Sequence, residues 1–472
     1  MKHNIKIFST LSSKKELIKP IKGKKINFFV CGPTVYDYSH LGHAKTYIAF
    51  DSFVKYLRSA GFTVFYLQNI TDIDDKIIAR AREREVPVKD LALAFEKEYL
   101  KDMKKLGVTS VSKYARATAH IKEIISQVER LTAKGFAYKI EGDGIYYNID
   151  KFKGYGKLSG RTALQAEDAV SRIDYSKDKK NRGDFCLWKF KQESSEPSWQ
   201  APFGEGRPGW HIEDTAITEK YFGSQYDIHG AARDLIFPHH EAEIAQMEAI
   251  SGKKPLAKYW MHGGFLTVNG QKMSKSLNNF TTIGDVLNRC SPQILRFLVI
   301  KNLWSSPMDY SESALIETKS ASDKIAEFLR KIRAVKNTKT DKKQQVQNKK
   351  LIEKSIKTFY AELDDDFNTP KALAVIFELI KAVNQLLDEG KLSKKEAETI
   401  YKFFEQIDKF LGIVDFKRVK QIIPASIKKL AKDREMFRKN KEWHKADEAR
   451  QQIEKQGYTI EDTKDGAVIK LI

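Results

Sequence analysis

The feature that most constrains the fold is a strand, loop, helix and strand that follow one another within roughly forty residues near the start of the chain. Ile26–Cys31 is a short apolar run that Gly32-Pro33 interrupts, as is typical of a buried strand. Helical periodicity then extends from about Leu41 to Ser59, with Gly61 as a C-terminal stop. Phe62–Gln68, rich in β-branched and aromatic residues, predicts the second strand. This order predicts a βαβ unit, and therefore an α/β fold with a parallel sheet that binds ligands at its strand ends.

The net charge narrows the choice of binding partner. With 83 Lys and Arg against 62 Asp and Glu, the 472-residue chain has a formal charge of +21. This charge favours polyanions, although a generally lysine-rich surface explains it equally well. No apolar run approaches the roughly 20 residues of a membrane helix, and the N-terminus lacks the apolar core of a secretory signal, so no membrane partner is expected. Three cysteines in so long a chain exclude a disulfide scaffold and favour a cytoplasmic location.

The pattern of the remaining sequence predicts several further segments. A hairpin is expected around a Gly-containing turn near residue 142, and the chain becomes strongly helical after about Glu312. The last part combines a basic helix with two short strand-like runs. We expect the division to be a parallel-sheet domain in two halves, 1–111 and 201–311; an insertion, 112–200; a helical bundle, 312–420; and a small C-terminal module, 421–472.

A polar motif between the first strand and its helix supplies groups suited to a phosphate. His40 and His43 lie three residues apart, so both imidazoles can lie on one face of the helix. Ser39 is expected to cap this helix, whose first N–H groups attract anions. Gly42 leaves the backbone open to an adenine or a ribose. Taken alone, such a histidine pair would usually be an ordinary cap and core pair.

A second motif, Lys272-Met-Ser-Lys275-Ser276, places two lysines on a hydroxyl-rich loop that can clamp a triphosphate and stabilise charge during nucleotidyl transfer. Such a loop is also common on protein surfaces. Together, in this order and separation, the two motifs resemble the HIGH and KMSKS signatures of class I aminoacyl-tRNA synthetases.

Within that class, the chain is similar to the cysteinyl-tRNA synthetases from about residue 5 to the C-terminus. The stretches that carry the similarity are Cys31–Asp37, Asn69–Lys76, Gly206–Glu213, Asp227–Gly230, Phe237–Glu243, Trp260–His262, Ser306–Tyr310 and Asp364–Pro370. The resemblance implies a Rossmann-like catalytic domain with a connective insertion, a helical tRNA-binding bundle and a small anticodon-binding module. It also implies a ligase that joins L-cysteine to tRNA(Cys) at the expense of ATP, with Mg²⁺ accompanying the nucleotide.

The resemblance assigns roles in the nucleotide site. His40, His43, Lys272 and Lys275 are the expected catalytic residues, with Lys275 the main group facing the transition-state phosphate charge. The residues expected to bind ATP are Pro33, Thr34, His40, Gly42, His43, His262, Lys272, Ser274 and Lys275.

A metal site is expected beside the first strand. His239 and Glu243 lie at i and i+4, a recurrent spacing for two zinc ligands on one helix, and Cys31 at the strand end can add a thiolate. From the residues alone, Cys31 can equally be a small core residue and His239 part of a solvated helix start. The resemblance implies that Cys31, His239 and Glu243 bind one Zn²⁺, which takes the substrate thiolate directly and so excludes serine.

The fourth ligand departs from the family pattern. The family's run Trp-His-Ile-Glu-Cys reads here with Asp214 in place of the cysteine. Aspartate keeps the negative charge and is a known zinc ligand, so we expect a Cys/Asp/His/Glu site. The alternative is a three-ligand site, or no zinc, with Asp214 only hydrogen-bonded nearby.

The resemblance further implies a cysteine pocket formed by Gly32, Thr71, Trp210 and His229. Three carboxylates, Asp72, Asp74 and Asp75, follow the second strand; one of them could hold the substrate ammonium, but capping a following helix is the commoner role.

The C-terminal module resembles the family's anticodon reader. Trp443 can stack an unpaired base, and Asp447 and Asp462 can accept hydrogen bonds from base edges. The alternative for Trp443 is the hydrophobic anchor of a small domain. The family's usual tryptophan near the C-terminus is absent.

Two rival functions stay open at this point. The cysteine–aminosugar ligase of mycothiol synthesis shares the catalytic core but lacks an anticodon module. A catalytically inactive RNA-binding paralogue is the other, although the intact histidines and lysines argue against it. No obligatory protein partner is expected, and a monomer is favoured.

Overall fold

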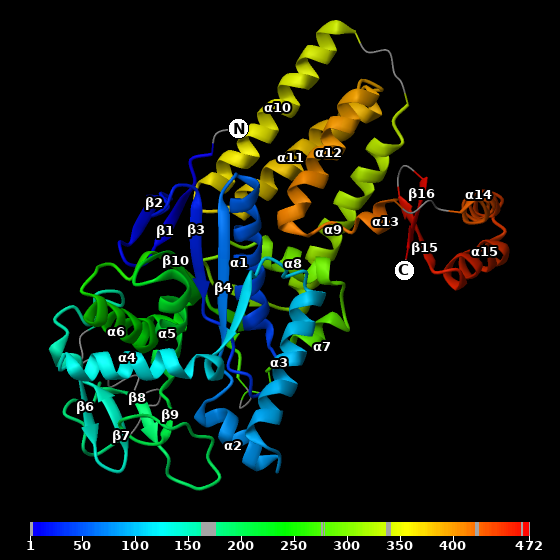
Figure 1. The fold of residues 1–472 in the computed structure, drawn as a ribbon. Coiled ribbons are helices and arrows are strands. Elements are labelled where there is room, and N and C mark those ends of the chain that lie inside the picture. Colours follow the sequence, from blue (N-terminus) through cyan, green and yellow to red (C-terminus); the bar gives the residue numbers. More distant parts are fainter. Residues whose placement is uncertain are drawn as a thin grey trace.

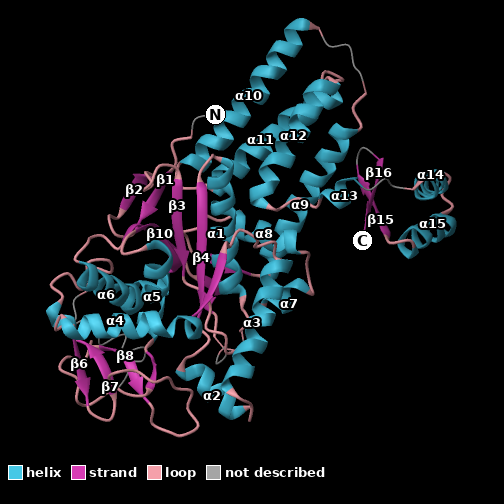
Figure 2. Cartoon of the chain, in the orientation of Figure 1, coloured by secondary structure: helices cyan, strands magenta, loops and turns pink. Residues whose placement is uncertain are grey.

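A parallel sheet forms the centre of the molecule (Figures 1 and 2). The computed structural model describes residues 3–161, 176–274, 277, 279–336, 341–420, 424–463 and 466–471. In these ranges the sheet has the strand order β11–β10–β3–β4–β5, and every neighbouring pair is parallel. The strands are β3 (Lys25–Val30), β4 (Thr63–Ile70), β5 (Lys113–Arg116), β10 (Tyr226–Ala232) and β11 (Ala257–Gly263).

The predicted βαβ unit is confirmed. Helix α1 (Leu41–Ser59) connects β3 to β4, and Gly61 lies just beyond it at φ +94°, a backbone conformation that favours glycine. The order of the sheet reverses between β3 and β10, because the chain builds outward from β3 to β5 and later returns to the other side. In a sheet of this kind, ligands bind beside the carboxyl ends of the two strands at that reversal.

Helices cover both faces of the sheet. Phe28 and Val30 pack on one face against α1 and α8 (Pro292–Ile300). Phe29 and Leu67 pack on the other. That second layer consists of α4 (Ile121–Ala133), α5 (Trp210–Phe222) and α6 (Glu241–Ser251). Alternate residues of one strand thus reach opposite cores, as expected for a strand buried on both sides.

An antiparallel sheet lies below α4 in Figure 1, and the expected hairpin is part of it. Its order is β6–β7–β8–β9, with β6 (Ala137–Ile140), β7 (Gly144–Tyr147), β8 (Phe185–Phe190) and β9 (Gly206–Pro208). Strand pairing crosses both predicted ends of the insertion. β5, which follows residue 112, pairs with β4 of the parallel sheet, and β9, which follows residue 200, pairs with β8 of the antiparallel sheet. The division of the chain into domains stays a prediction.

The C-terminal third is helical, as predicted, and ends in a small module. The helices are α9 (Glu312–Arg333), α10 (Lys342–Asp364), α11 (Thr369–Asp388), α12 (Lys394–Leu411), α13 (Phe416–Lys420), α14 (Ala425–Lys439) and α15 (Trp443–Lys455). Strands β15 (Tyr458–Thr463) and β16 (Gly466–Leu471) pair as an antiparallel hairpin. No helix of the described ranges is both long and apolar enough to cross a membrane. The remaining elements are α2 (Asp75–Glu83), α3 (Val88–Lys105), α7 (Ile283–Leu287), β12 (Leu266–Val268), β13 (Gln271–Lys272) and β14 (Met308–Tyr310).

Arg296 joins the C-terminal helices to the part of the chain that contains the parallel sheet. It lies on α8, is 3% exposed, and donates to the Leu411 carbonyl oxygen at the end of α12 (3.0 Å). The same guanidinium donates to Asp51 (3.1 Å) and Ser52 (2.9 Å) of α1. Gly412 follows α12 at φ +65°, and a Cβ there would lie 2.6 Å from Arg296 Nε. The glycine therefore leaves the space that the guanidinium occupies.

The N-terminal hairpin of β1 (Lys6–Ser9) and β2 (Lys14–Leu17) contacts segments that are distant in the sequence. The Thr10 N–H donates to the Trp260 carbonyl oxygen (2.9 Å). The Phe8 N–H donates to Asp366 (2.8 Å), and Lys15 pairs with Asp365 (2.8 Å). The hairpin is therefore held both to β11 of the sheet and to the acidic run after α10.

Candidate metal and nucleotide site

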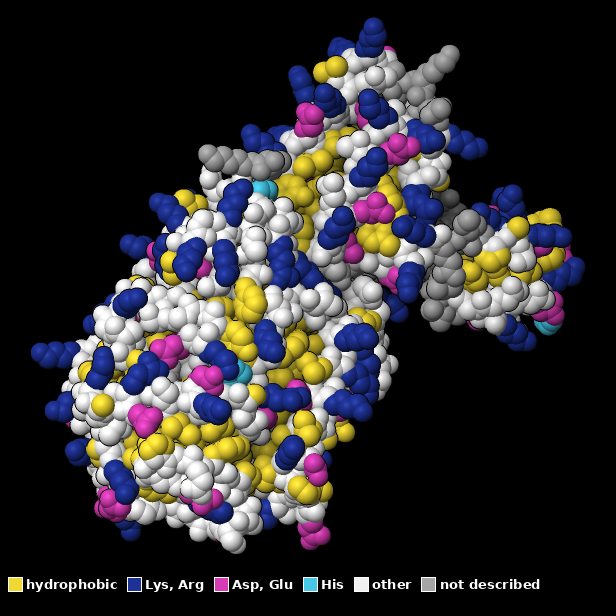
Figure 3. Space-filling view, in the orientation of Figure 1, with side chains coloured by type: hydrophobic (Ala, Val, Ile, Leu, Met, Phe, Trp, Pro, Cys, Tyr) yellow, Lys and Arg dark blue, Asp and Glu magenta, His cyan; other side chains and the backbone are white. Residues whose placement is uncertain are grey.

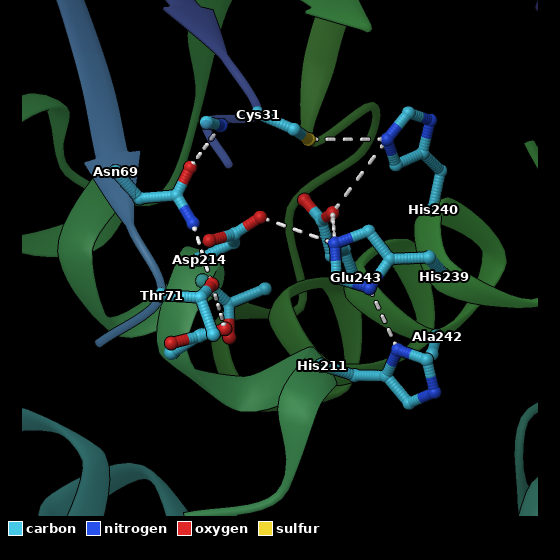
Figure 4. A network of polar contacts seen from close by, with 12 residues as sticks. Cys31, Asn69, Thr71, His211, Asp214, His239, His240, Ala242 and Glu243 are labelled. Carbon is cyan, nitrogen blue, oxygen red and sulfur yellow. Dashed lines mark hydrogen bonds and ion pairs between the residues drawn. The ribbon is translucent and has the colours of Figure 1, made fainter. Parts of the chain in front are cut away.

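Four buried ligand groups meet where the order of the sheet reverses (Figure 4). Cys31 directly follows β3, Asp214 lies on α5, His239 precedes α6 and Glu243 lies in its first turn. One ligand atom from each lies within 4.8 Å of the others. His239 Nε2 is 3.1 Å from Asp214 Oδ2 and 3.2 Å from Glu243 Oε1. The structure therefore brings together all four expected metal ligands, including Asp214.

The charge of this cluster is not balanced by the protein. Burial, together with Asp214, raises the pKa of the Cys31 thiol and that of the Glu243 carboxyl well above their ordinary values. Asp214 Oδ1 and both oxygens of Glu243 receive no hydrogen bond from the residues that the structure describes. The nearest histidine nitrogens to Glu243 are those of His239 (3.2 Å) and His229 (3.6 Å). Buried acceptors normally have partners, so three orphaned oxygens beside a thiol and an imidazole fit a divalent cation.

Two further histidines surround the Cys31 sulfur. His240 Nε2 and His229 Nε2 lie 3.3 Å and 3.4 Å from Sγ. The other ring nitrogen of each histidine also has a partner. The Tyr226 hydroxyl contacts His229 Nδ1 (2.7 Å), and His262 Nε2 contacts His240 Nδ1 (2.8 Å). Such contacts fix the tautomer and orientation of an imidazole beside a metal ligand.

His262, an expected nucleotide-binding residue, makes two contacts within the protein, and its role toward ATP stays a prediction. Its Nδ1 lies 2.7 Å from the Thr10 hydroxyl and its Nε2 faces His240, so both ring nitrogens are used within this chain of contacts. Sequence reasoning missed the roles of His240 and Thr10, because they contact His262 from 22 and 252 residues away in the sequence.

The expected cysteine pocket adjoins the cluster. His229 is fully buried in β10, and Trp210 at the start of α5 stacks on His239 with ring centroids 4.4 Å apart. Thr71 follows β4, and its N–H donates to the Pro33 carbonyl oxygen (3.2 Å). The Gly32 N–H donates to the Asn69 side chain (2.5 Å), and a Cβ on Gly32 would overlap the Asn69 carbonyl. The loops after β3 and β4 are thus held in close contact.

Ser39 was expected to cap α1, and this prediction is wrong. The N-cap is His40, whose Nδ1 accepts a hydrogen bond from the Gly42 N–H (3.1 Å). The Nδ1 of His43 in turn accepts from the His40 N–H (3.3 Å), so the two histidines form a reciprocal capping box. A Cβ on Gly42 would lie 2.8 Å from the His40 ring, so the glycine makes room for the cap.

This capping arrangement determines the form of both rings. Because each Nδ1 is an acceptor, the neutral rings carry their proton on Nε2, which remains available to a ligand. Burial lowers the pKa of His40 to about 4 and that of His43 well below its ordinary value, so both rings are neutral at pH 7. The rings stack with centroids 3.9 Å apart.

The lysine loop is joined to the start of α1. The Leu41 N–H donates to the Thr281 carbonyl oxygen (3.1 Å), and the Ile283 N–H donates to that of Ser39 (2.9 Å). Lys272 is exposed on β13; Asn279 accepts from the Ser274 N–H (2.8 Å) and donates to the Lys272 carbonyl oxygen (3.1 Å). Lys275 and Ser276 lie outside the described residues.

Glu241, which the sequence reasoning overlooked, holds the start of α6 against the preceding loop. It is fully buried and accepts hydrogen bonds from the N–H groups of Gly156 (2.9 Å), Leu158 (2.5 Å) and Ser159 (2.7 Å). The Ser159 hydroxyl adds a fourth contact (3.1 Å). Glu241 therefore supports the helix that carries Glu243.

Replacing Glu241 by alanine is expected to lower the free energy of unfolding by about 2–4 kcal/mol, because three backbone donors lose their acceptor. Glutamine keeps one carbonyl oxygen and should lose less. Urea unfolding checks both variants, and an alanine variant as stable as the wild type would contradict this role.

The three residues expected to contact the anticodon have different surroundings in the C-terminal module. Trp443 is 58% exposed and lies outside the module's small apolar core, so it does not serve as a hydrophobic anchor. Asp447 is exposed. Asp462 pairs with both Arg434 (2.7 Å) and Arg438, and the Arg434 guanidinium lowers the pKa of this carboxyl to about 2. Two of the three side chains are therefore open to a ligand.

A curated "Cysteine--tRNA ligase" of Thermococcus gammatolerans is 43% identical over 99% of both chains. The chain belongs to the cysteine–tRNA ligase family. A protein of the same name from Thermoplasma volcanium is 44% identical over 98% of this chain and 99% of that one, and one from Thermodesulfovibrio yellowstonii is 39% identical over 99% of both. The family model described as "tRNA synthetases class I (C) catalytic domain" matches residues 17–320, and the DALR domain model matches residues 358–415.

Solved structures agree on the fold. Methionyl-tRNA synthetase of Mycobacterium tuberculosis in complex with methionyl-adenylate has a TM-score of 0.60 at 14% identity, over 86% of this chain and 91% of that one. The LeuRS–tRNA–LeuAMS complex of Agrobacterium radiobacter K84 has a TM-score of 0.61 at 11% identity, over 84% and 85%. The class I synthetase fold that the motifs implied is therefore confirmed, with a helical DALR domain following it.

Proposed function

We propose that this protein activates L-cysteine with ATP and transfers it to the 3′-terminal ribose of tRNA(Cys). The observation that carries the proposal is the buried, uncompensated cluster of Cys31, Asp214, His239 and Glu243 at the end of β3. It lies at the sheet reversal, a short loop before the helix that His40 caps. The family's curated members, named Cysteine--tRNA ligase and matched over nearly their full length, support it.

The cluster is proposed to hold one Zn²⁺. One sulfur, one imidazole nitrogen and two carboxylate oxygens form a set that zinc accepts. When bound, zinc supplies a site for the substrate thiolate, for which a serine hydroxyl is a far poorer ligand. Trp210, stacked on His239, forms a rigid apolar wall beside the small substrate side chain, while Thr71 and His229 offer polar groups.

In the first reaction step, the cysteine carboxylate attacks the α-phosphate of ATP, giving cysteinyl-adenylate and pyrophosphate. His40 and His43 present Nε2–H donors to the phosphates, and Lys272 and Lys275 compensate the charge that develops on them. Pro33, Thr34, Gly42 and Ser274 border the nucleotide. Mg²⁺ accompanies ATP and is held mainly by phosphate oxygens.

In the second step, a hydroxyl of the terminal ribose attacks the acyl carbon and releases AMP. The helical part, residues 312–420, binds the tRNA, and the module of residues 421–472 contacts the anticodon through Trp443 and Asp447. On the face shown in Figure 3, Lys and Arg side chains gather beside α3 and α7, on the flank nearer this module. The reaction places the protein in the cytoplasm, where tRNA is charged, and one chain supplies every group that it needs.

Replacing His40 by asparagine is expected to separate its two roles. Asparagine is a strong N-cap, so thermal stability should change little, whereas the lost Nε2–H donor should slow ATP–pyrophosphate exchange about 100-fold or more. Alanine should lose both the cap and the rate. An asparagine variant that retains exchange within about threefold of wild type would remove His40 from the phosphate site.

Three measurements test the proposed function against its rivals. Cysteine-dependent ATP–pyrophosphate exchange, charging of tRNA(Cys) and ligation of cysteine to an amino sugar are compared for the wild-type protein. Exchange with tRNA charging supports the proposal. Exchange with sugar ligation alone indicates the mycothiol-type ligase, and no exchange indicates an inactive paralogue.

A further inference from the structure

Glu213 is a buried carboxylate that none of the roles above uses. It precedes Asp214 on α5 and is 1% exposed. Its Oε1 accepts a hydrogen bond from the Thr71 hydroxyl (2.6 Å), whereas its Oε2 receives none from the residues that the structure describes. A buried carboxylate oxygen without a donor is uncommon, so the orphaned atom calls for a ligand.

The contacts around Thr71 place this oxygen at the expected cysteine pocket. Asn69 accepts from the Gly32 N–H and donates to the Thr71 hydroxyl oxygen (3.4 Å). Thr71 gives its single hydroxyl proton to Glu213. Figure 4 shows Asn69 and Thr71 on the side of the site that faces Asp214. The chain of contacts thus runs from the Gly32 backbone, next to the metal ligand Cys31, to Glu213.

The other carboxylates of the pocket are already committed. Asp72 accepts hydrogen bonds from the N–H (2.9 Å) and hydroxyl (2.5 Å) of Thr118. Asp74 caps α2, and Asp75 pairs with Arg207. Both oxygens of Asp72 and one oxygen of Asp74 are thus already used, and Asp75 faces an arginine, although one of the three was the expected partner of the substrate ammonium.

The substrate has one more charged group than the site has assigned partners. Its thiolate goes to the metal cluster and its carboxylate to the nucleotide, which leaves the α-ammonium without an anion. We propose that Glu213 Oε2 binds the α-ammonium of the amino-acid substrate, with the free lone pair of Thr71 as a second acceptor; this rests on the proposed function. Because Glu213 and Asp214 are adjacent on one helix, about 100° apart around its axis, α5 sets the spacing between ammonium and thiolate.

Glu213→Gln tests this role, with zinc-loaded protein and two thiols as probes. L-Cysteine and 3-mercaptopropionate share the thiol and the carboxylate, and only cysteine carries the ammonium. Loss of a charge-assisted hydrogen bond should weaken cysteine binding about 30-fold, while 3-mercaptopropionate binding stays within about threefold of wild type. Isothermal titration measures both, and zinc content is determined for each sample.

Two further variants separate ammonium binding by Glu213 from a general loss of structure. Glu219→Gln makes the same change on the same helix, where Glu219 pairs with Arg130, and should alter neither affinity. Asp72→Asn tests the rival carboxylate. Equal weakening of both thiols, unchanged cysteine affinity, loss of zinc in Glu213→Gln, or selective cysteine loss only in Asp72→Asn would each overturn the assignment. If the wild-type protein binds neither thiol, the proposed function fails instead.

Discussion

Replacing Asp214 by asparagine is expected to lower zinc affinity by more than about 100-fold, and to reduce cysteine-dependent ATP–pyrophosphate exchange correspondingly. Loss of an outer-shell partner of a zinc site already costs 10- to 100-fold, and Asp214 lies directly against His239 in the cluster. The asparagine keeps the size of the side chain but removes its charge, which leaves Cys31 and Glu243 to balance the cation. Competition with a chromophoric chelator measures the affinity.

Asp214→Cys is the control variant of this experiment, because it replaces one zinc ligand by another. It restores the ligand of the family pattern, and should bind zinc at least as tightly as the wild type because thiolate is a softer ligand. Zinc that remains stoichiometric and equally tight in both Asp214→Asn and Asp214→Ala would contradict the ligand role and leave a three-ligand site.

Replacing Arg296 by methionine is expected to destabilise the protein by about 2–4 kcal/mol, because Asp51 loses one of its two ionic partners while Lys55 stays paired with it (2.7 Å). Asp51 is fully buried, and the Leu411 carbonyl oxygen also loses its donor. The two parts of the chain that Arg296 joins should then separate more easily. Charging of tRNA should therefore fall further than ATP–pyrophosphate exchange, and urea unfolding should become less cooperative than in the wild type.

An exposed pair gives the control for Arg296. Arg289 contacts Glu312 with both side chains more than half exposed, so Arg289→Met should cost less than about 1 kcal/mol. If the two variants have the same free energy of unfolding, the buried contacts of Arg296 contribute no more to stability than an exposed ion pair. A parallel fall in charging and exchange would show that it does not couple the helical part to the catalytic part.

Much of the fold could be predicted from local pattern. The bounds of α1 follow from its periodicity and from Gly61, and those of β3 and β4 from short apolar runs that turn residues end. These signals are local, since a few consecutive residues determine them. The histidine motif at residues 40–43 and the lysine motif at residues 272–276 are each common. Only their combination indicates that segments so far apart in the sequence belong to one nucleotide site.

The details of the site depended on contacts that no short pattern contains. The sequence offered Asp72 as one possible partner of the substrate ammonium, and it could not show that Thr118 already donates to both oxygens of that carboxylate. The cap of α1 was assigned to Ser39 because serine is the usual cap, whereas a histidine accepting through Nδ1 takes that place here. The contact of His262 with His240 joins residues 22 apart in the sequence, and no short pattern relates them.

The contacts of the N-terminal hairpin bear on the order in which the chain folds. Its hydrogen bond and ion pair to Asp366 and Asp365 span 358 and 350 residues. Loops of this size close slowly, and larger proteins fold in stages as they leave the ribosome. The hairpin's contacts with Asp365 and Asp366 therefore cannot form until α10 has been translated. Before that point, the hairpin has its own strand pairing and its contact with Trp260 to hold it.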